Sequence, residues 1–83
     1  MSKITRLDVI SLIEVSLGLS SGSLSENACA EEVEGWDSLG QLSILVALDK
    51  VFDGRIADLA EIATADSVQK ILKILNENNL IEV

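Results

Sequence analysis

The stretch Glu34-Gly35-Trp36-Asp37-Ser38-Leu39-Gly40 marks the point where a long polar segment meets an apolar helix. Asp37 is a favourable N-cap residue because its carboxylate can accept hydrogen bonds from the free backbone N–H groups of the first helical turn. Ser38 then lies at the helix N-terminus, where unsatisfied N–H donors and the helix dipole favour a phosphate group. The stretch therefore predicts a helix that begins at Ser38, and it places this serine where a phosphodiester would be stabilised.

This helix, expected from about Ser38 to Phe52, has apolar residues on two opposite sides, since successive side chains are about 100° apart around a helix axis. One stripe comprises Ile44, Leu45, Leu48, Val51 and Phe52, and the other comprises Leu39, Leu42 and Val46, flanked by Ser43, Asp49 and Lys50. The second stripe begins beside Ser38. We expect it to be an exposed surface that binds partners through Leu39, Leu42, Val46 and Asp49; the alternative is that another element covers it.

The segments before this helix predict one further helix and a long connection. Ser2 is expected to cap a helix that Gly18 ends, and the apolar residues on one face of this helix are Ile4, Leu7, Ile10, Ile13 and Leu17. Residues 19–37 are rich in Ser, Gly and Glu, with Leu24, Val33 and Trp36 as apolar anchors. A connection of this length in a small domain is usually functional or fixed across a surface.

The segments after it predict two more helices. Asp53-Gly54 reads as a helix stop and turn, followed by a short helix from Ile56 to Ile62. Thr64 or Asp66 should cap the last helix, which ends within Asn76–Asn79 and buries Val68, Ile71, Leu72 and Leu75, with Lys70 and Lys73 on its other side. A short tail of Leu80, Ile81 and Val83 is expected to fold back. The prediction is one all-α domain over residues 1–83, a small four-helix bundle with three long helices and one short one.

Composition narrows the function classes. A net charge of −8 argues against nucleic acid and anionic membrane surfaces as partners and favours basic proteins. Glu31, Glu32 and Glu34 are read as a solvated rim, with a docking surface as the alternative. No run of residues is long and apolar enough to span a membrane, and no signal peptide is evident, so we expect a cytoplasmic monomer.

The chain also lacks the usual parts of an enzyme. It has no histidine, and the single Cys29 has neither a disulfide partner nor a catalytic base of the Cys-His kind. Aligning Gly54 with the glycine of a calcium-binding EF-hand loop puts Val51 and Ala60 where oxygen ligands are needed, so a calcium site is not expected. We predict no catalytic activity and no metal site.

The Gly-Trp-Asp-Ser-Leu motif and the apolar helix after it resemble the attachment site and second helix of acyl and peptidyl carrier proteins. The resemblance spans nearly the whole chain. It implies an acyl-carrier-type bundle with a 4′-phosphopantetheine arm on Ser38, flanked by Asp37 and Leu39. It also implies, as partners, a phosphopantetheinyl transferase and the acyl or aminoacyl ligases and synthases that act on the loaded arm.

Several positions differ from fatty-acid carriers. Gly40 and Ser43 stand where those carriers usually have acidic residues, Lys50 adds a positive charge, and Ala57 replaces a usual proline. These differences favour a carrier of a specialised pathway, with acyl, polyketide or aminoacyl cargo. The alternative is an unmodified acidic helical interaction module, which accounts for the composition but leaves Gly-Trp-Asp-Ser-Leu unexplained.

Overall fold

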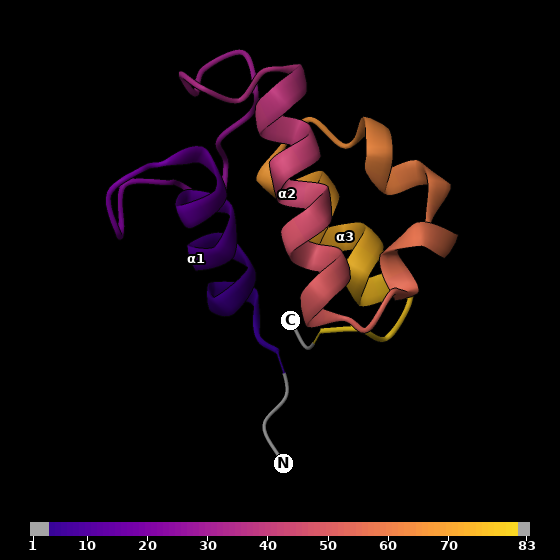
Figure 1. Cartoon of the computed structure of the whole chain (residues 1–83). Helices are drawn as coiled ribbons and strands as arrows, with labels where there is room; N and C mark the ends of the chain where they lie inside the picture. The colour runs from indigo at the N-terminus through magenta and orange to yellow at the C-terminus, as the bar shows by residue number, and fades with distance from the viewer. Residues whose placement is uncertain (1–3, 82–83) are drawn as a thin grey trace.

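The computed structural model describes residues 4–81, which form three α-helices and two short 3₁₀ helices. These are α1 (Arg6–Leu17), α2 (Ser38–Val51), η1 (Arg55–Asp58), η2 (Ala60–Thr64) and α3 (Val68–Glu77) (Figure 1). Within residues 4–81 no strand is formed, and β-type pairing is limited to an isolated bridge between Cys29 and Ser67. The predicted all-α fold is therefore confirmed.

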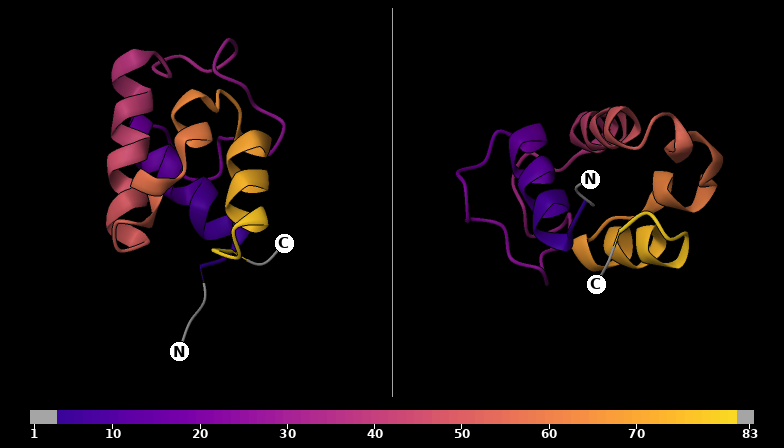
Figure 2. Two further views of the ribbon diagram at one scale, coloured as in Figure 1. Left: turned by 90° about the vertical axis from the view of Figure 1, so that its right-hand side faces the viewer. Right: turned by 90° about the horizontal axis from the view of Figure 1, so that it is seen from below.

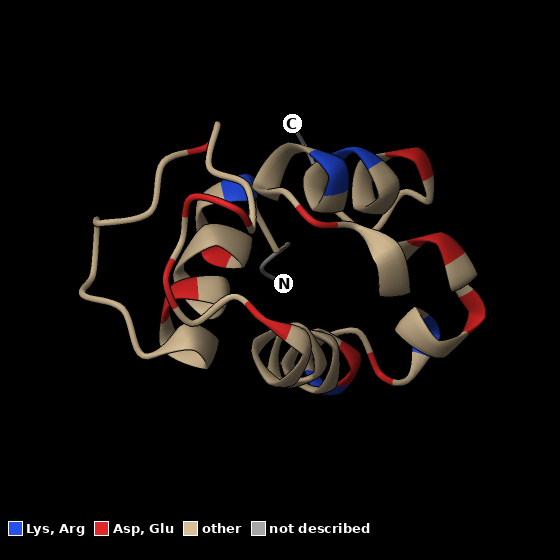
Figure 3. Cartoon of the chain, turned by 90° about the horizontal axis from the view of Figure 1, so that it is seen from above, with Lys and Arg blue, Asp and Glu red and all other residues tan. Residues whose placement is uncertain are grey.

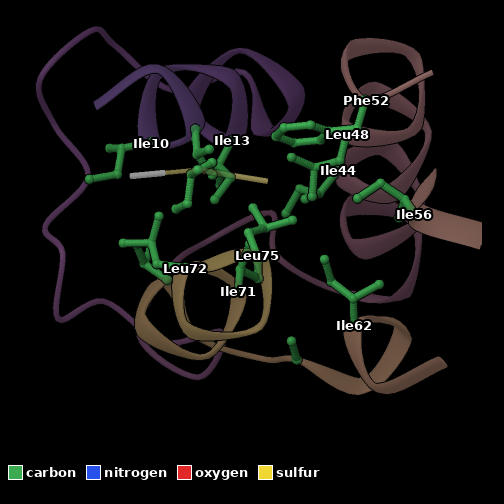
Figure 4. Close-up of a cluster of buried hydrophobic side chains, with 14 of the residues drawn as sticks. Ile10, Ile13, Ile44, Leu48, Phe52, Ile56, Ile62, Ile71, Leu72 and Leu75 are labelled. Carbon is green, nitrogen blue, oxygen red and sulfur yellow. The ribbon is translucent and has the colours of Figure 1, made fainter. Parts of the chain in front are cut away.

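The helices are arranged in a ring around one core. Helix α1 packs against α2 and α3, and the η1–η2 segment closes the ring by packing against α2 on one side and α3 on the other (Figure 2). The core is mainly aliphatic, and its most deeply buried side chains include Ile13, Ile44, Leu48, Ile62, Ile71 and Leu75 (Figure 4). Each of the five elements contributes at least one buried apolar residue, so all five are tied to the same core.

Helix α1 begins later than the sequence suggested. The predicted cap, Ser2, lies outside the described residues, and Thr5 is the N-cap instead, so Ile4 precedes the helix. Thr5 Oγ1 accepts a hydrogen bond from Asp8 N at 3.2 Å, and Asp8 Oδ2 accepts one from Thr5 N at 2.9 Å. This reciprocal pair is a capping box built with aspartate in place of the more usual glutamate. Gly18, with φ of 72°, ends the helix as predicted.

The predicted core face of α1 was partly wrong. Ile10 and Ile13 are buried, but Leu7 is 66% exposed. Leu7 precedes Ile13 by six residues, which places it about 120° away around the helix axis. Val9, which lies closer to the direction of Ile13, is buried in its place.

The long connection, residues 19–37, is fixed at several points. Leu24 and Trp36 are buried and Val33 is half-buried, as predicted for its apolar anchors. The buried Glu14 of α1 accepts a hydrogen bond from Leu24 N at 2.9 Å, and Arg6 forms a 3.0 Å ion pair with Glu26. Further along, backbone hydrogen bonds join the connection to the start of α3: Ala30 N donates to Asp66 O at 2.7 Å, and Val68 N donates to Ala28 O at 3.0 Å. The segment is therefore tied to both α1 and α3.

The predicted single helix from Ile56 to Ile62 was wrong, because the segment is broken at Leu59 into η1 and η2. Ile56 and Ile62 are both buried. Their spacing of six residues would put them about 120° apart on one continuous helix. The break at Leu59 allows both side chains to reach the core. The preceding stop at Asp53-Gly54 is confirmed, with φ of 54° and 82° at the two residues.

Helix α3 follows the prediction except at its cap. Ser67, rather than Thr64 or Asp66, is the N-cap, and its side chain accepts a hydrogen bond from Lys70 N at 3.2 Å. The four predicted core residues are buried, and Lys70 and Lys73 are exposed.

In the tail after α3, Ile81 is buried and Leu80 is half-buried, which confirms that this part of the tail folds back. Val83 lies outside the described residues. In residues 4–81 no helix is both long and apolar enough to cross a bilayer.

Candidate functional site

Ser38 is the first residue of α2, and its side chain is exposed. Asp37 caps the helix as predicted: its Oδ1 accepts a hydrogen bond from Gly40 N at 2.9 Å, and its carbonyl oxygen accepts one from Gln41 N at 2.8 Å. Within residues 4–81, the backbone N–H groups of Ser38 and Leu39 have no hydrogen-bond acceptor. A negatively charged group joined to the Ser38 hydroxyl would therefore lie beside two free donors at the positive end of the helix dipole.

A network of hydrogen bonds fixes the chain on one side of Ser38. The buried Trp36 donates from Nε1 to Gln41 Oε1 at 2.7 Å. Gln41 Nε2 in turn lies 3.3 Å from the carbonyl oxygens of Ile62 and Ala63 and 3.0 Å from that of Ala65. One glutamine thus connects the residues before α2 with η2 and the approach to α3. Gln41 was not predicted from the sequence, although a polar residue at a core-facing position of α2 is a detectable signal.

Gly40 is buried where α2 passes close to Gly35 and α1. A Cβ atom at this position would overlap the carbonyl oxygen of Gly35 and lie 2.8 Å from Leu17 Cδ2. The absence of a side chain is therefore a packing requirement. Gly40 stands where fatty-acid carriers usually have an acidic residue, but its position is buried here, so a side chain at it would not add charge to an exposed surface of α2. Ser43, the other residue that stands where those carriers have an acid, is exposed.

A shallow hollow of about 600 Å³ adjoins Ser38 between α2 and η2. Ser38, Gln41, Leu42 and Leu45 form its α2 side, and its other lining residues are Ala30, Trp36, Asp37, Ala63, Thr64 and Asp66. The lining is predominantly apolar, although the hollow is open to solvent. A group tethered to Ser38 could rest in it without disturbing the core.

The second apolar stripe of α2, hereafter the α2 strip, consists of Leu39, Leu42 and Val46. These side chains are 76%, 57% and 48% exposed, which confirms the expected exposure; their role in partner binding stays a prediction. Asp49, predicted as part of the same surface, is half-buried, and its Oδ1 atom is buried with no hydrogen-bond partner among residues 4–81. In the opposite stripe Val51 is 37% exposed, so that side of α2 is buried mainly through Ile44, Leu48 and Phe52.

The charge around the site is mostly negative. Glu31, Glu32 and Glu34 are exposed in the segment that leads to Ser38, as expected for a solvated rim, and Figure 3 shows acidic residues on this segment. Cys29 Sγ donates to Glu32 Oε1 at 3.3 Å, and this hydrogen bond to a carboxylate is the main cause that raises the pKa of the thiol. A raised pKa leaves less of the nucleophilic thiolate near neutral pH. The geometry thus favours a structural role for Cys29 over a nucleophilic one.

The basic residues of α3, Lys70 and Lys73, do not line the hollow beside Ser38, although Lys70 contacts Asp66, which does. Lys70 Nζ pairs with Asp66 Oδ1 at 2.8 Å on the surface, and this contact lowers the pKa of Asp66 and raises that of Lys70. Within the described part of the chain, no three His, Cys, Asp or Glu side chains are grouped closely enough to hold a metal ion.

Comparison of the chain with protein-family models, curated proteins and solved structures found no match.

Proposed function

We propose that this protein is a carrier that bears acyl, polyketide or aminoacyl intermediates as thioesters on a 4′-phosphopantetheine arm attached to Ser38. The observation that carries the proposal is an exposed serine in a Gly-Trp-Asp-Ser-Leu motif, located at a capped helix N-terminus beside two free N–H donors. These donors match the negative charge of a phosphodiester, so the residues present fit the group. When bound, the arm would supply the thiol that forms the thioester.

The chain's own residues would position the arm and its partners. Asp37 fixes the start of α2, and Leu39 places an apolar side chain next to the attachment point. The α2 strip offers an apolar surface for the transferase and for the ligases or synthases that act on the cargo. We further propose an acyl-carrier-type bundle, in which η1 and η2 together replace the short third helix, and a cytoplasmic monomer.

The exposed α2 strip also supports a second candidate, an unmodified acidic helical interaction module. Such a module would use Leu39, Leu42 and Val46 to bind a protein without any covalent group. It gives no reason for an accessible serine beside free donors. The two candidates differ in one measurable property, which is whether Ser38 acquires an arm.

The test is intact-mass spectrometry after incubation with coenzyme A and a phosphopantetheinyl transferase of broad specificity. We expect the wild-type protein to gain one phosphopantetheine and Ser38→Ala to gain none. Ser43→Ala is the matched control, since Ser43 is another exposed serine on α2 and its loss should leave modification intact. Circular dichroism should show that both variants keep the helical content of the wild type. No mass gain in the wild type, or a gain in Ser38→Ala, would falsify the carrier function.

A further inference from the structure

Gln41 lies between the Ser38 hollow and the hydrophobic core. It follows Ser38 by three residues, so the two side chains are neighbours on adjacent turns of α2, and both line the hollow. Its amide crosses from α2 to η2 and the residue that follows it, where Nε2 lies 3.0–3.3 Å from the carbonyl oxygens of Ile62, Ala63 and Ala65. This contact joins α2 to η2 within about one turn of Ser38.

The core begins directly behind this contact. The side chain of Ile62, whose carbonyl oxygen faces Gln41, is almost completely buried. On α2, the next two turns bring Ile44 and then Leu48 into the core, and neither is exposed to solvent. A chain that entered from the hollow alongside Gln41 would have to displace its amide to pass between α2 and η2 at this point.

Displacing the amide would leave several polar groups without partners at once. Trp36 Nε1–H would lose its 2.7 Å acceptor, and the Gln41 amide would lose one donor and its acceptors. The carbonyl oxygens of Ile62, Ala63 and Ala65 would lose a donor. Trp36 is buried, so water has limited access to its indole N–H, whereas Gln41 is half-buried and its contact with Ala63 O lies at the surface. Unpaired buried polar groups oppose such an opening, and methylene groups entering the core would have to offset that penalty.

We propose that Gln41 is a specificity-determining residue that keeps the cargo out of the core. The inference rests on the proposed carrier function and narrows its cargo. A group on the Ser38 arm that folds back onto the protein rests in the open hollow beside Leu42, Leu45 and Ala63, outside the core, and it stays in contact with solvent there. This protein therefore carries short acyl, polar acyl or aminoacyl groups, and a long acyl chain on the arm remains in contact with solvent.

The experiment uses the full chain loaded with acetyl, octanoyl or palmitoyl phosphopantetheine by a transferase that accepts acyl-coenzyme A. Two quantities are measured for each form: the melting temperature by circular dichroism and the rate at which hydroxylamine cleaves the thioester. For the wild type we expect both to be independent of chain length. The emission maximum of Trp36, the chain's single tryptophan, should also be unchanged, because the hydrogen bond to Gln41 stays intact.

The Gln41→Ala substitution removes the amide that joins α2 to η2 and leaves a space in its place. In this variant we expect the melting temperature to rise with chain length and cleavage of the palmitoyl thioester to slow several-fold. Gln69→Ala is the matched control: Gln69 also joins two parts of the chain, with Nε2 donating to Asn27 Oδ1 at 2.6 Å, but it is exposed on α3 and does not line the hollow. It should behave like the wild type.

If the melting temperature or the cleavage rate of the wild type depends on acyl-chain length, the role of Gln41 is overturned. The carrier function would stand, because loading would already have succeeded. A folded Gln41→Ala variant with no chain-length dependence would overturn the role of Gln41 as well. If that variant does not fold, the wild-type series alone decides the question. Failure of the wild type to accept any arm would instead refute the proposed function, and the cargo inference would fall with it.

Discussion

The two sides of α2 carry similar aliphatic side chains but have opposite environments. Ile44 and Leu48 are fully buried, whereas Leu39 and Leu42, of the same chemical kind and on the same helix, are mostly exposed. Neighbouring elements account for the difference, because α1, η1 and η2 pack against α2 on its buried side. The hydrophobicity of a helical residue therefore does not reveal which side becomes core; the packing of the rest of the chain decides it.

The comparison also separates two uses of an apolar side chain. On the buried side each leucine or isoleucine contributes roughly 1.5–3 kcal/mol to folding. On the exposed side the same residues gain little of this free energy, and single exposed apolar residues are common on protein surfaces. Three of them on one helix side, beginning next to Ser38, form a contiguous apolar area that a partner can cover.

The largest expected effect is on the buried side. Leu48→Ala should lower the free energy of unfolding by about 2–5 kcal/mol, because it leaves a cavity among close-packed side chains. Leu42→Ala makes the same chemical change on the exposed side of the same helix and should cost less than about 1 kcal/mol. Urea denaturation followed by circular dichroism measures both values. Similar losses for the two variants would mean that the sides of α2 do not differ as the structure describes.

An intermediate effect is expected at Gly40, which lies on neither apolar side. Gly40→Ala places a methyl group against Gly35 O and Leu17, and such overpacking costs about 1–3 kcal/mol. This exceeds the gain of up to about 1 kcal/mol that alanine has over glycine in a helix. We therefore expect a lower midpoint in urea, with Ser43→Ala, an exposed change on the same helix, as the control. A Gly40→Ala variant more stable than the wild type would show that the contact relaxes easily.

Much of the fold was predictable from local signals. The Asp37 cap, the stop at Gly18, the turn at Asp53-Gly54 and the core face of α3 were confirmed, since each depends on a short pattern of residues. The two wrong predictions concern residues whose burial depends on how neighbouring elements pack together. Leu7 fits the spacing of an apolar face but points away from the neighbours of α1, and the segment from Ile56 breaks so that two isoleucines can be buried.

The candidate site was only partly predictable for the same reason. Ser38 and Asp37 follow from a local motif, and helical spacing separates the α2 strip from the opposite stripe without deciding which of the two is exposed. The roles of Gln41, Gly40 and Glu14 depend on residues that are distant in sequence or belong to another element. Glu14, for example, is buried because the connection 19–37 folds over α1 and its Leu24 N–H needs an acceptor. No periodicity within α1 contains that information.

The smallest effect on stability is expected for the α2 strip, where the effect on function should be largest. Leu42→Ala and Val46→Ala remove exposed side chains, so both proteins should melt close to the wild type. If partner enzymes cover the strip, each variant should nevertheless slow transfer of the cargo from the loaded arm. The contact is apolar, so partner affinity should weaken only modestly as salt is raised, in contrast to the affinity of a surface that is recognised through its charge.

The test measures transfer rate and partner affinity at low and moderate salt, alongside thermal melting. Val15→Ala is the control because Val15 is an exposed valine on α1. If the variants lose stability but keep wild-type affinity per folded molecule, the α2 strip belongs to the core. If both variants keep wild-type stability and wild-type transfer rates, the α2 strip is not part of the partner interface.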